Sequence, residues 1–223
     1  MTIKLTIPTS LKDITLEQYQ RFMYVTENNK DEEFITQKMI EIFCGVPLHL
    51  VSQLPLIEVK LIIESLENVF EEKPKLQRII KLGNVNFGFI PNLDKISLGE
   101  YADLSGYIDK WDKMHKGFAV LYRPITDGHK DKYQIEEYKG SEVYADVMKH
   151  LTLDVVIGAR LFFWNLMSDL LNSSLKFIQN NKELMDMIDK HNSQKNGNGI
   201  PFYINSLREI LDDSMKFLKL RYF

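Results

Sequence analysis

The sequence predicts a mainly α-helical protein with a small β component, an α+β fold, on three observations. Apolar residues recur at helical spacing over most of the 223-residue chain. Residues 76–90 instead alternate around a Gly-Asn pair, which predicts a short antiparallel hairpin. Residues 152–180 are apolar on nearly every side of a helix, which favours a buried central helix over an exposed oligomerisation helix.

A helix-start motif occurs twice, at residues 7–19 and again at residues 90–101. In each copy a Thr or Ser can cap the helix, and a Gln or Glu three positions later can bond back to it, which is a capping box. The two pairs are Thr15 with Gln18 and Ser97 with Glu100. An Ile before each cap and a Tyr four residues after it form a hydrophobic staple. An internal duplication and the general need of helices for caps both explain the repetition.

Apolar stripes bounded by capping or helix-breaking residues predict further helices. They are expected over residues 31–44, 48–53, 55–72, 117–122 and about 141–148. The helix after the second motif has an apolar face that includes Leu98 and Tyr101, the counterparts of Leu16 and Tyr19 after the first. Residues 1–112 are therefore expected to form one unit that the second copy of the motif closes.

The remaining stretches are assigned to strands and loops. Residues 2–6 alternate and are expected to pair with the hairpin. Residues 127–132 are predicted to form a polar loop, and residues 133–138 an exposed strand. Each helix-start motif follows a predicted strand and contains a Pro, which cannot donate to a β-ladder and so belongs at a strand end.

The expected organisation has four parts. Residues 1–112 form the α+β unit, 113–190 a helical unit around the central helix, 191–199 a flexible Gly- and Asn-rich linker, and 200–223 an amphipathic helix. One continuous domain is the alternative. The last helix packs either on its own chain or on a neighbouring subunit, through a narrow stripe that includes Leu207, Leu211 and Leu218.

Composition excludes several classes of function. A net charge of −3 and a pI near 6.0 do not predict the basic surface of a sequence-specific nucleic-acid binder. The single cysteine, Cys44, rules out a disulfide within the chain. The first residues lack the apolar core of a signal peptide, and no uncharged run reaches the roughly 20 residues of a membrane span, so no membrane insertion is expected.

No pattern in the chain predicts catalysis or a cofactor. The five histidines are scattered, and none has a second ligand at metal-binding spacing. A nucleophile elbow, a P-loop and a dinucleotide fingerprint are all missing from the sequence. We therefore expect no catalytic, cofactor-binding or metal-binding residues, and an enzyme with dispersed active-site residues is an unfavoured alternative.

Residues 89–104 and 114–125 carry a resemblance. These stretches, together with residues 7–19, are similar to structural and assembly proteins of tailed bacteriophages, most closely those of crAss-like and related phages of Bacteroidales. The similarity covers about two thirds of the chain and rests on structural rather than catalytic motifs. It implies a protein of the virion, or of the host cytoplasm during assembly, and it transfers no active-site residues.

The resemblance implies function through protein–protein contacts. A neck or tail ring, an adaptor near the portal, or a protein packaged with the particle is the first expectation, with other phage structural proteins and copies of itself as partners. An assembly chaperone absent from the finished particle is the alternative. Tyrosine and arginine are common interface anchors, so the candidate interface residues are Tyr122, Arg123, Tyr133 and Tyr138, with the leucines of the terminal helix.

Overall fold

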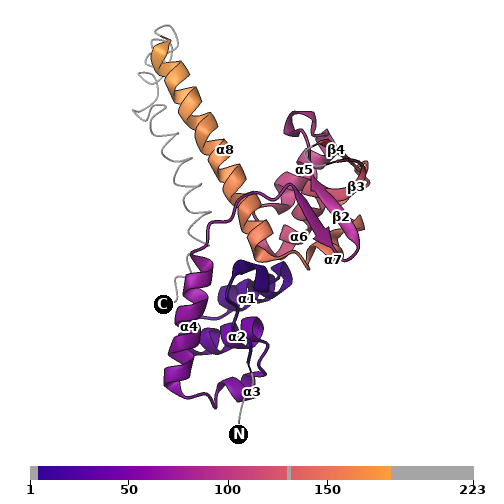
Figure 1. Cartoon of the computed structure of the whole chain (residues 1–223). Helices are drawn as coiled ribbons and strands as arrows, with labels where there is room; N and C mark the ends of the chain where they lie inside the picture. Colours follow the sequence, from indigo (N-terminus) through magenta and orange to yellow (C-terminus); the bar gives the residue numbers. More distant parts are fainter. Residues whose placement is uncertain (1–4, 130–131, 182–223) are drawn as a thin grey trace. The chain divides into compact units, whose positions relative to one another are not determined.

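The computed structural model describes residues 5–129 and 132–181, and the chain divides into two compact units (Figure 1). The first unit extends to Ala159 and the second begins at Arg160. The boundary expected at residue 112 falls inside the first unit. The predicted linker at 191–199 and the predicted helix at 200–223 lie outside the described residues. Among the described residues the fold is mainly helical with one small antiparallel sheet, which confirms the predicted fold class.

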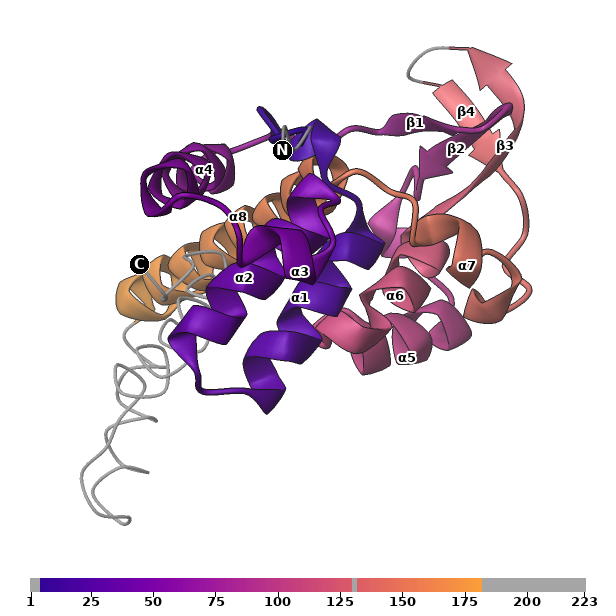
Figure 2. The same cartoon turned by 90° about the horizontal axis from the view of Figure 1, so that it is seen from below.

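The first part of this unit is a cluster of helices built on aromatic contacts (Figures 1 and 2). It contains the 3₁₀ turn η1 (Leu11–Asp13) and helices α1 (Leu16–Asn28), α2 (Glu32–Cys44), α3 (Leu48–Val51) and α4 (Leu56–Phe70). Asp31 caps α2, and Gly45 ends it with a φ of +66° that favours glycine. Phe43 packs against both Phe22 and Phe70, with ring centroids 5.2 and 5.6 Å away.

The sheet has four antiparallel strands in the order β1-β2-β3-β4. They are β1 (Ile79–Leu82), β2 (Val85–Phe89), β3 (Tyr122–His129) and β4 (Lys132–Ile135). The predicted hairpin is confirmed, because β1 and β2 pair around Gly83, whose φ is +58°. Strand β3 joins β2 with Phe89 opposite Tyr122, and its pairing with β4 contains an irregularity between Ile125 and Asp127.

Strand β3 replaces two predicted features. The helix expected at 117–122 is α6 (Met114–Leu121), and Tyr122 is the first residue of the strand rather than the last of the helix. Of the polar loop expected at 127–132, residues 127–129 are the end of β3 and Lys132 is the first residue of β4. Leu5 and Thr6 are not in a strand, and the hairpin pairs with β3 instead. Pairing between segments over 30 residues apart leaves no local pattern in the sequence.

Short helices cover the sheet (Figure 2). They are η2 (Leu93–Lys95), α5 (Leu98–Tyr107), η3 (Trp111–Lys113), α6, η4 (Ser141–Val143) and α7 (Ala145–Met148). Helix α6 supplies much of the core, and Phe118 stacks on Tyr122 with ring centroids 6.0 Å apart. Phe87, on the next strand, meets the edge of Tyr144 at 5.5 Å. The apolar face of the sheet is thus sealed by aromatic rings.

Helix α8 (Leu153–Asn180) is the predicted long helix, and the buried residues among its described side chains lie at its start. Residues 153–159 are all buried in the first unit, and the chain crosses the helix so closely that a Cβ on Gly158 would lie 2.5 Å from the carbonyl oxygen of Lys75. Beyond Ala159, Leu166 is 45% exposed and Phe177 is 64% exposed. The expectation of burial along the whole helix is therefore wrong at these positions.

Candidate interaction surface

The two helix-start motifs form the same succession of elements. Each begins with a capped 3₁₀ turn, η1 after Ser10 and η2 after Asn92, and continues through an extended Ile into a capped α-helix. In the first copy Thr15 accepts from the amide of Gln18 at 3.2 Å, and the Gln18 side chain accepts from the Thr15 amide at 2.9 Å. The second capping box has the same two bonds, at 3.3 and 2.7 Å. Both predicted capping boxes are confirmed.

The first copy is completely covered. Ile14, Leu16 and Tyr19 are at most 1% exposed. The ring of Tyr19 lies 4.6 Å from that of Trp111 and 5.9 Å from that of Phe70. Burial of these side chains is the main reason that α1 is stable in place.

The connection between α7 and α8, residues 149–153, closes the first copy through its backbone. The amide of Leu16 donates to Leu151 at 2.7 Å, and the amide of Leu153 donates to Ile14 at 2.8 Å. These two bonds flank an antiparallel bridge between Thr15 and Thr152. The segment therefore satisfies backbone groups of the motif that a helix start leaves without intrahelical partners.

The second copy has the same apolar residues and leaves them uncovered. Leu98, the counterpart of Leu16, is 84% exposed, and Tyr101, the counterpart of Tyr19, is 60% exposed. The structure records no hydrogen bond from the amides of Leu98 and Gly99 to another described residue. Leu98, Tyr101 and these two amides form what we call the α5 face. Leu98 and Tyr101 thus point away from the protein, against expectation, while Leu104 one turn later is half-buried.

Helix α5 is turned outward because its inner side is polar. Glu100, only 7% exposed, accepts from Arg123 of β3 at 2.5 Å while it completes the capping box. One helical turn further on, Asp103 accepts from the hydroxyl of Tyr138. The guanidinium of Arg123 also lies 5.6 Å from the centre of the Tyr138 ring. These contacts anchor the charged side of α5 to the sheet and leave its apolar side free.

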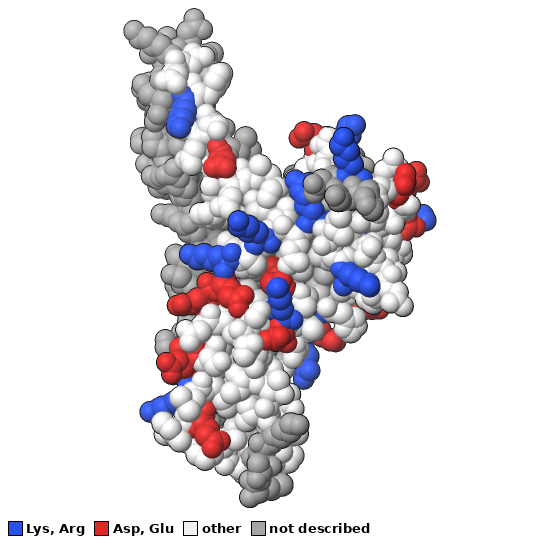
Figure 3. All heavy atoms as spheres, viewed as in Figure 1, with Lys and Arg blue, Asp and Glu red and all other residues white. Residues whose placement is uncertain are grey.

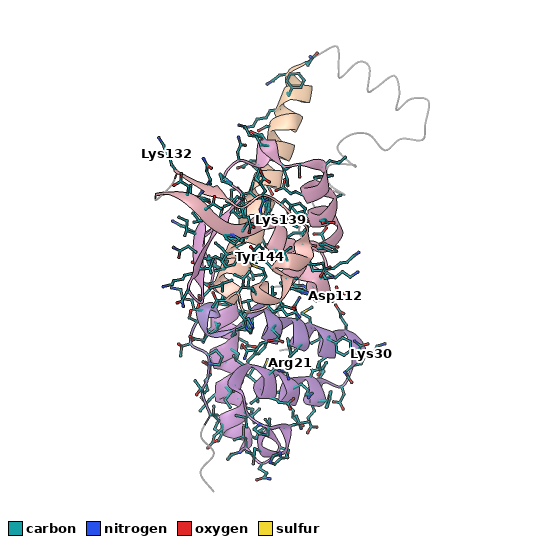
Figure 4. All side chains as sticks on the ribbon, turned by 90° about the vertical axis from the view of Figure 1, so that its right-hand side faces the viewer. Arg21, Lys30, Asp112, Lys132, Lys139 and Tyr144 are labelled. Carbon is teal, nitrogen blue, oxygen red and sulfur yellow. The ribbon has the colours of Figure 1, made fainter. Side chains whose placement is uncertain are left out.

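Electrostatics favour this arrangement. Burial disfavours ionised Glu100, but the hydrogen bonds from Ser97 and the positive charge of Arg123 outweigh it and hold the pKa of Glu100 below its usual value. Burial and the bond to Asp103 raise the pKa of Tyr138, so its hydroxyl stays protonated and donates. Glu136 extends the polar network, because it accepts from both Lys139 and Tyr144, which are labelled in Figure 4.

The predicted interface residues lie mostly inside the fold. Tyr122 is fully buried and donates to the carbonyl of Gln77 at 2.7 Å. Burial, with smaller effects of Tyr133 and Asp154, raises the pKa of Tyr122. Tyr133 is 8% exposed and donates to the carbonyl of Phe89 at 2.7 Å. Arg123 is 7% exposed, and Tyr138 is half-buried. Leu207, Leu211 and Leu218 lie outside the described residues.

Burial therefore removes Tyr122, Arg123 and Tyr133 from the surface available to a partner. Tyr133 belongs to the sheet interior because β4 pairs with β3 and places it over Gly88, rather than in an exposed strand as expected. The structure does bring Arg123 and Tyr138 together, but as the internal anchor of α5. Leu98 and Tyr101 are surface residues that their sequence pattern does not reveal. Their pattern is that of a core face, and only the distant Arg123 shows that Glu100 points inward.

A second group of exposed apolar side chains lies on α4. Leu56, Ile57 and Leu61 are 59% to 70% exposed. They share one side of the helix, while Ile62, Leu66 and Val69 form its buried side. Exposed apolar side chains that cluster in this way are typical of protein contact sites.

Other classes of site find no support in the described residues. Within residues 5–129 and 132–181 no group of three or more His, Cys, Asp or Glu side chains is placed to hold a metal ion. No described helix is both long and apolar enough to cross a membrane. On the face shown in Figure 3, basic and acidic side chains are interspersed rather than gathered by sign.

Comparison of the chain with protein families, with curated proteins and with solved structures finds no match.

Proposed function

We propose that the protein is a non-enzymatic component of a bacteriophage virion, a neck or tail ring, an adaptor or a packaged protein, that acts through protein–protein contacts. The observation that carries the contact role is the α5 face, where a motif that is buried in its first copy is left uncovered in its second. The virion role rests on the resemblance of residues 89–104 and 114–125 to phage structural proteins. The α5 face lies within the first of these stretches.

Physical reasoning connects the two lines of support. An exposed leucine with its backbone amide free to donate offers a partner both apolar area and directional hydrogen bonds. The residues that fix α5 in place are separate from those it exposes. A subunit of a large assembly requires such a division, because it must fold before it meets its neighbours.

The test is proteomics of purified particles of the phage that encodes the chain. We expect peptides of this protein in the particle at a ratio to the portal or tail proteins that is constant between preparations. Its absence from particles would refute the virion role. Absence from particles combined with failed assembly when the gene is inactivated would instead identify an assembly chaperone.

A set of variants tests whether the α5 face makes the contacts that assembly needs. Charge-reversing substitutions at exposed positions away from α5 are expected to leave particle formation unchanged, whereas Leu98→Asp is expected to reduce it. Normal particle yield with Leu98→Asp would remove the α5 face from the contacts that matter.

A further inference from the structure

The covered first copy of the helix-start motif shows which kind of segment could cover the second copy. Its occupant is the connection from the end of α7 to the start of α8, in which Leu151 supplies one carbonyl and Leu153 one amide to the backbone on either side of the Thr15–Thr152 bridge. It also supplies a second carbonyl, because the amide of Glu17 donates to Lys149 at 3.0 Å. The α5 face presents the equivalent groups, the amides of Leu98 and Gly99 and the carbonyl of Ile96, at a constant offset of 82 residues.

One other segment of the chain has the sequence of this occupant. Residues 150–153 read His-Leu-Thr-Leu, and residues 4–7 read Lys-Leu-Thr-Ile, so a basic residue, Leu, Thr and an aliphatic residue follow one another in both. The structure records no hydrogen bond from the backbone of Leu5, Thr6 or Ile7 to another described residue. Thr6 is exposed, and Leu5 and Ile7 are half-buried. This segment therefore has backbone groups free for pairing.

Charge also matches. Residues 2–7 contain one lysine and no carboxylate. Apart from Glu100, whose charge is balanced by Arg123, residues 92–109 contain three carboxylates, Asp94, Asp103 and Asp109, against one lysine, a net charge of −2 from 1 − 3. Attraction between the two segments adds to the apolar contact.

We propose that the α5 face binds residues 3–7 of a second copy of this chain. By analogy with the first copy, Thr6 lies opposite Ser97, the amide of Leu98 donates to the carbonyl of Leu5, and the amide of Ile7 donates to the carbonyl of Ile96. Leu5 covers Leu98. The proposal names a partner for the contact role argued above and rests on that role.

The geometry has a consequence for assembly. The α5 face and residues 3–7 are different surfaces, so each copy uses one to bind the next copy and the other to be bound. Such a head-to-tail contact is heterologous and generates rings when the rotation closes, or filaments when it does not. Burial of one leucine is worth roughly a tenfold to hundredfold change in association constant.

The test measures the mass of the full chain by light scattering at increasing concentration. We expect wild type to associate, and Leu98→Asp and Leu5→Asp each to be monomeric. A mixture of these two variants is expected to form a 1:1 dimer, because one has an intact segment and the other an intact α5 face. Tyr24→Asp on α1, which alters another large exposed side chain (69% exposed) outside both the α5 face and the α4 group, is the matched control and should associate like wild type.

Several results would overturn the proposal. Wild type that stays monomeric, or Leu98→Asp that associates like wild type, removes the α5 face from self-association. Loss of association in Leu98→Asp with normal association in Leu5→Asp means that another segment is the occupant. A mixture that remains monomeric excludes head-to-tail pairing.

A crosslink tests the register even if Leu5→Asp fails to fold. Two residues that face each other as a non-hydrogen-bonded antiparallel pair, as Thr15 and Thr152 do, have Cα atoms about 4.5 Å apart. This distance is within the range of a disulfide. We expect Thr6→Cys mixed with Ser97→Cys to give a disulfide-linked dimer, and Thr9→Cys mixed with Ser97→Cys to give none. Cys44 does not compete, because it is buried and burial raises its pKa to about 11. Equal crosslinking of both mixtures would refute the register. Virion proteomics is unaffected by these outcomes, so this inference and the virion role fail separately.

Discussion

Removing the charge of Glu100 tests whether the buried ion pair fixes the orientation of α5. Glu100→Gln keeps the shape of the side chain and the capping box, since Gln18 completes the same box in the first copy. It leaves the guanidinium of Arg123, only 7% exposed, without a counter-ion. Breaking a buried pair on one side costs about 3–5 kcal/mol. We expect a loss of that size in the free energy of unfolding, measured by urea titration with circular dichroism.

A double-mutant cycle makes the prediction specific. Arg123→Met replaces the charge with an apolar side chain of similar length, and the double variant should cost less than the sum of the single ones by more than about 1 kcal/mol. Glu142→Gln is the matched control, because Glu142 pairs with Lys116 at 2.6 Å but its side chain is 70% exposed, so the loss should stay below about 1 kcal/mol. If Glu100→Gln costs no more than this control, the pair does not hold α5.

Three further substitutions test other contacts. Gly158→Ala should destabilise the protein by about 1–3 kcal/mol in urea titration, because its Cβ would lie 2.5 Å from the carbonyl oxygen of Lys75. Tyr122→Phe should cost about 1–2 kcal/mol, because it leaves a buried carbonyl without its donor. His115 accepts from Gln20 at 2.9 Å, and burial and nearby lysines lower its pKa, so the free energy of unfolding should fall as pH drops below the unfolded value of 6.5. The unfolded chain binds the proton first in that range, and the slope should disappear in His115→Asn.

Each of these three substitutions has a control variant elsewhere in the chain or an outcome that would contradict it. Gly106→Ala, on α5 with open space around its Cα, should instead stabilise by about 0.5–1 kcal/mol. Equal signs for Gly106→Ala and Gly158→Ala would contradict the crossing at Lys75. Tyr101→Phe should leave stability unchanged because its ring is exposed, and a loss equal to that of Tyr122→Phe would show a general effect of the hydroxyl. A pH slope that persists in His115→Asn would come from another group.

Local physics explains how much of the fold is predictable from the sequence. Caps at Thr15, Asp31 and Ser97 and the turn at Gly83 act within a few residues, and the structure has each of them. Strand β3 depends on a partner 33 residues away, since Tyr122 pairs with Phe89. The local helical pattern therefore continues one residue past the end of α6 and does not predict the strand. Long-range pairing is fixed by tertiary contacts that no short window contains.

The candidate site shows a different limit. Leu98 and Tyr101 have the spacing of a core face, and their counterparts in the first copy are indeed buried. The ion pair of Glu100 with Arg123, a residue predicted to lie at an interface, turns the opposite side of α5 toward the protein. Hydrophobic periodicity identifies which residues share a side of a helix, but which side faces the protein depends on the partner that the other side finds.

The division of labour on α5 has an evolutionary consequence. Glu100 and Arg123 are bound to each other, so a change at one requires a change at the other. Leu98 and Tyr101 contact little of their own chain, so they can be exchanged without loss of the fold. Among relatives of this protein, the residues at positions 100 and 123 should covary. The residues at positions 98 and 101 should instead change together with the surface of the partner that they contact. Leu98 and Glu100 lie on the same turn of α5, yet substitution at Leu98 would then be limited by binding and substitution at Glu100 by folding.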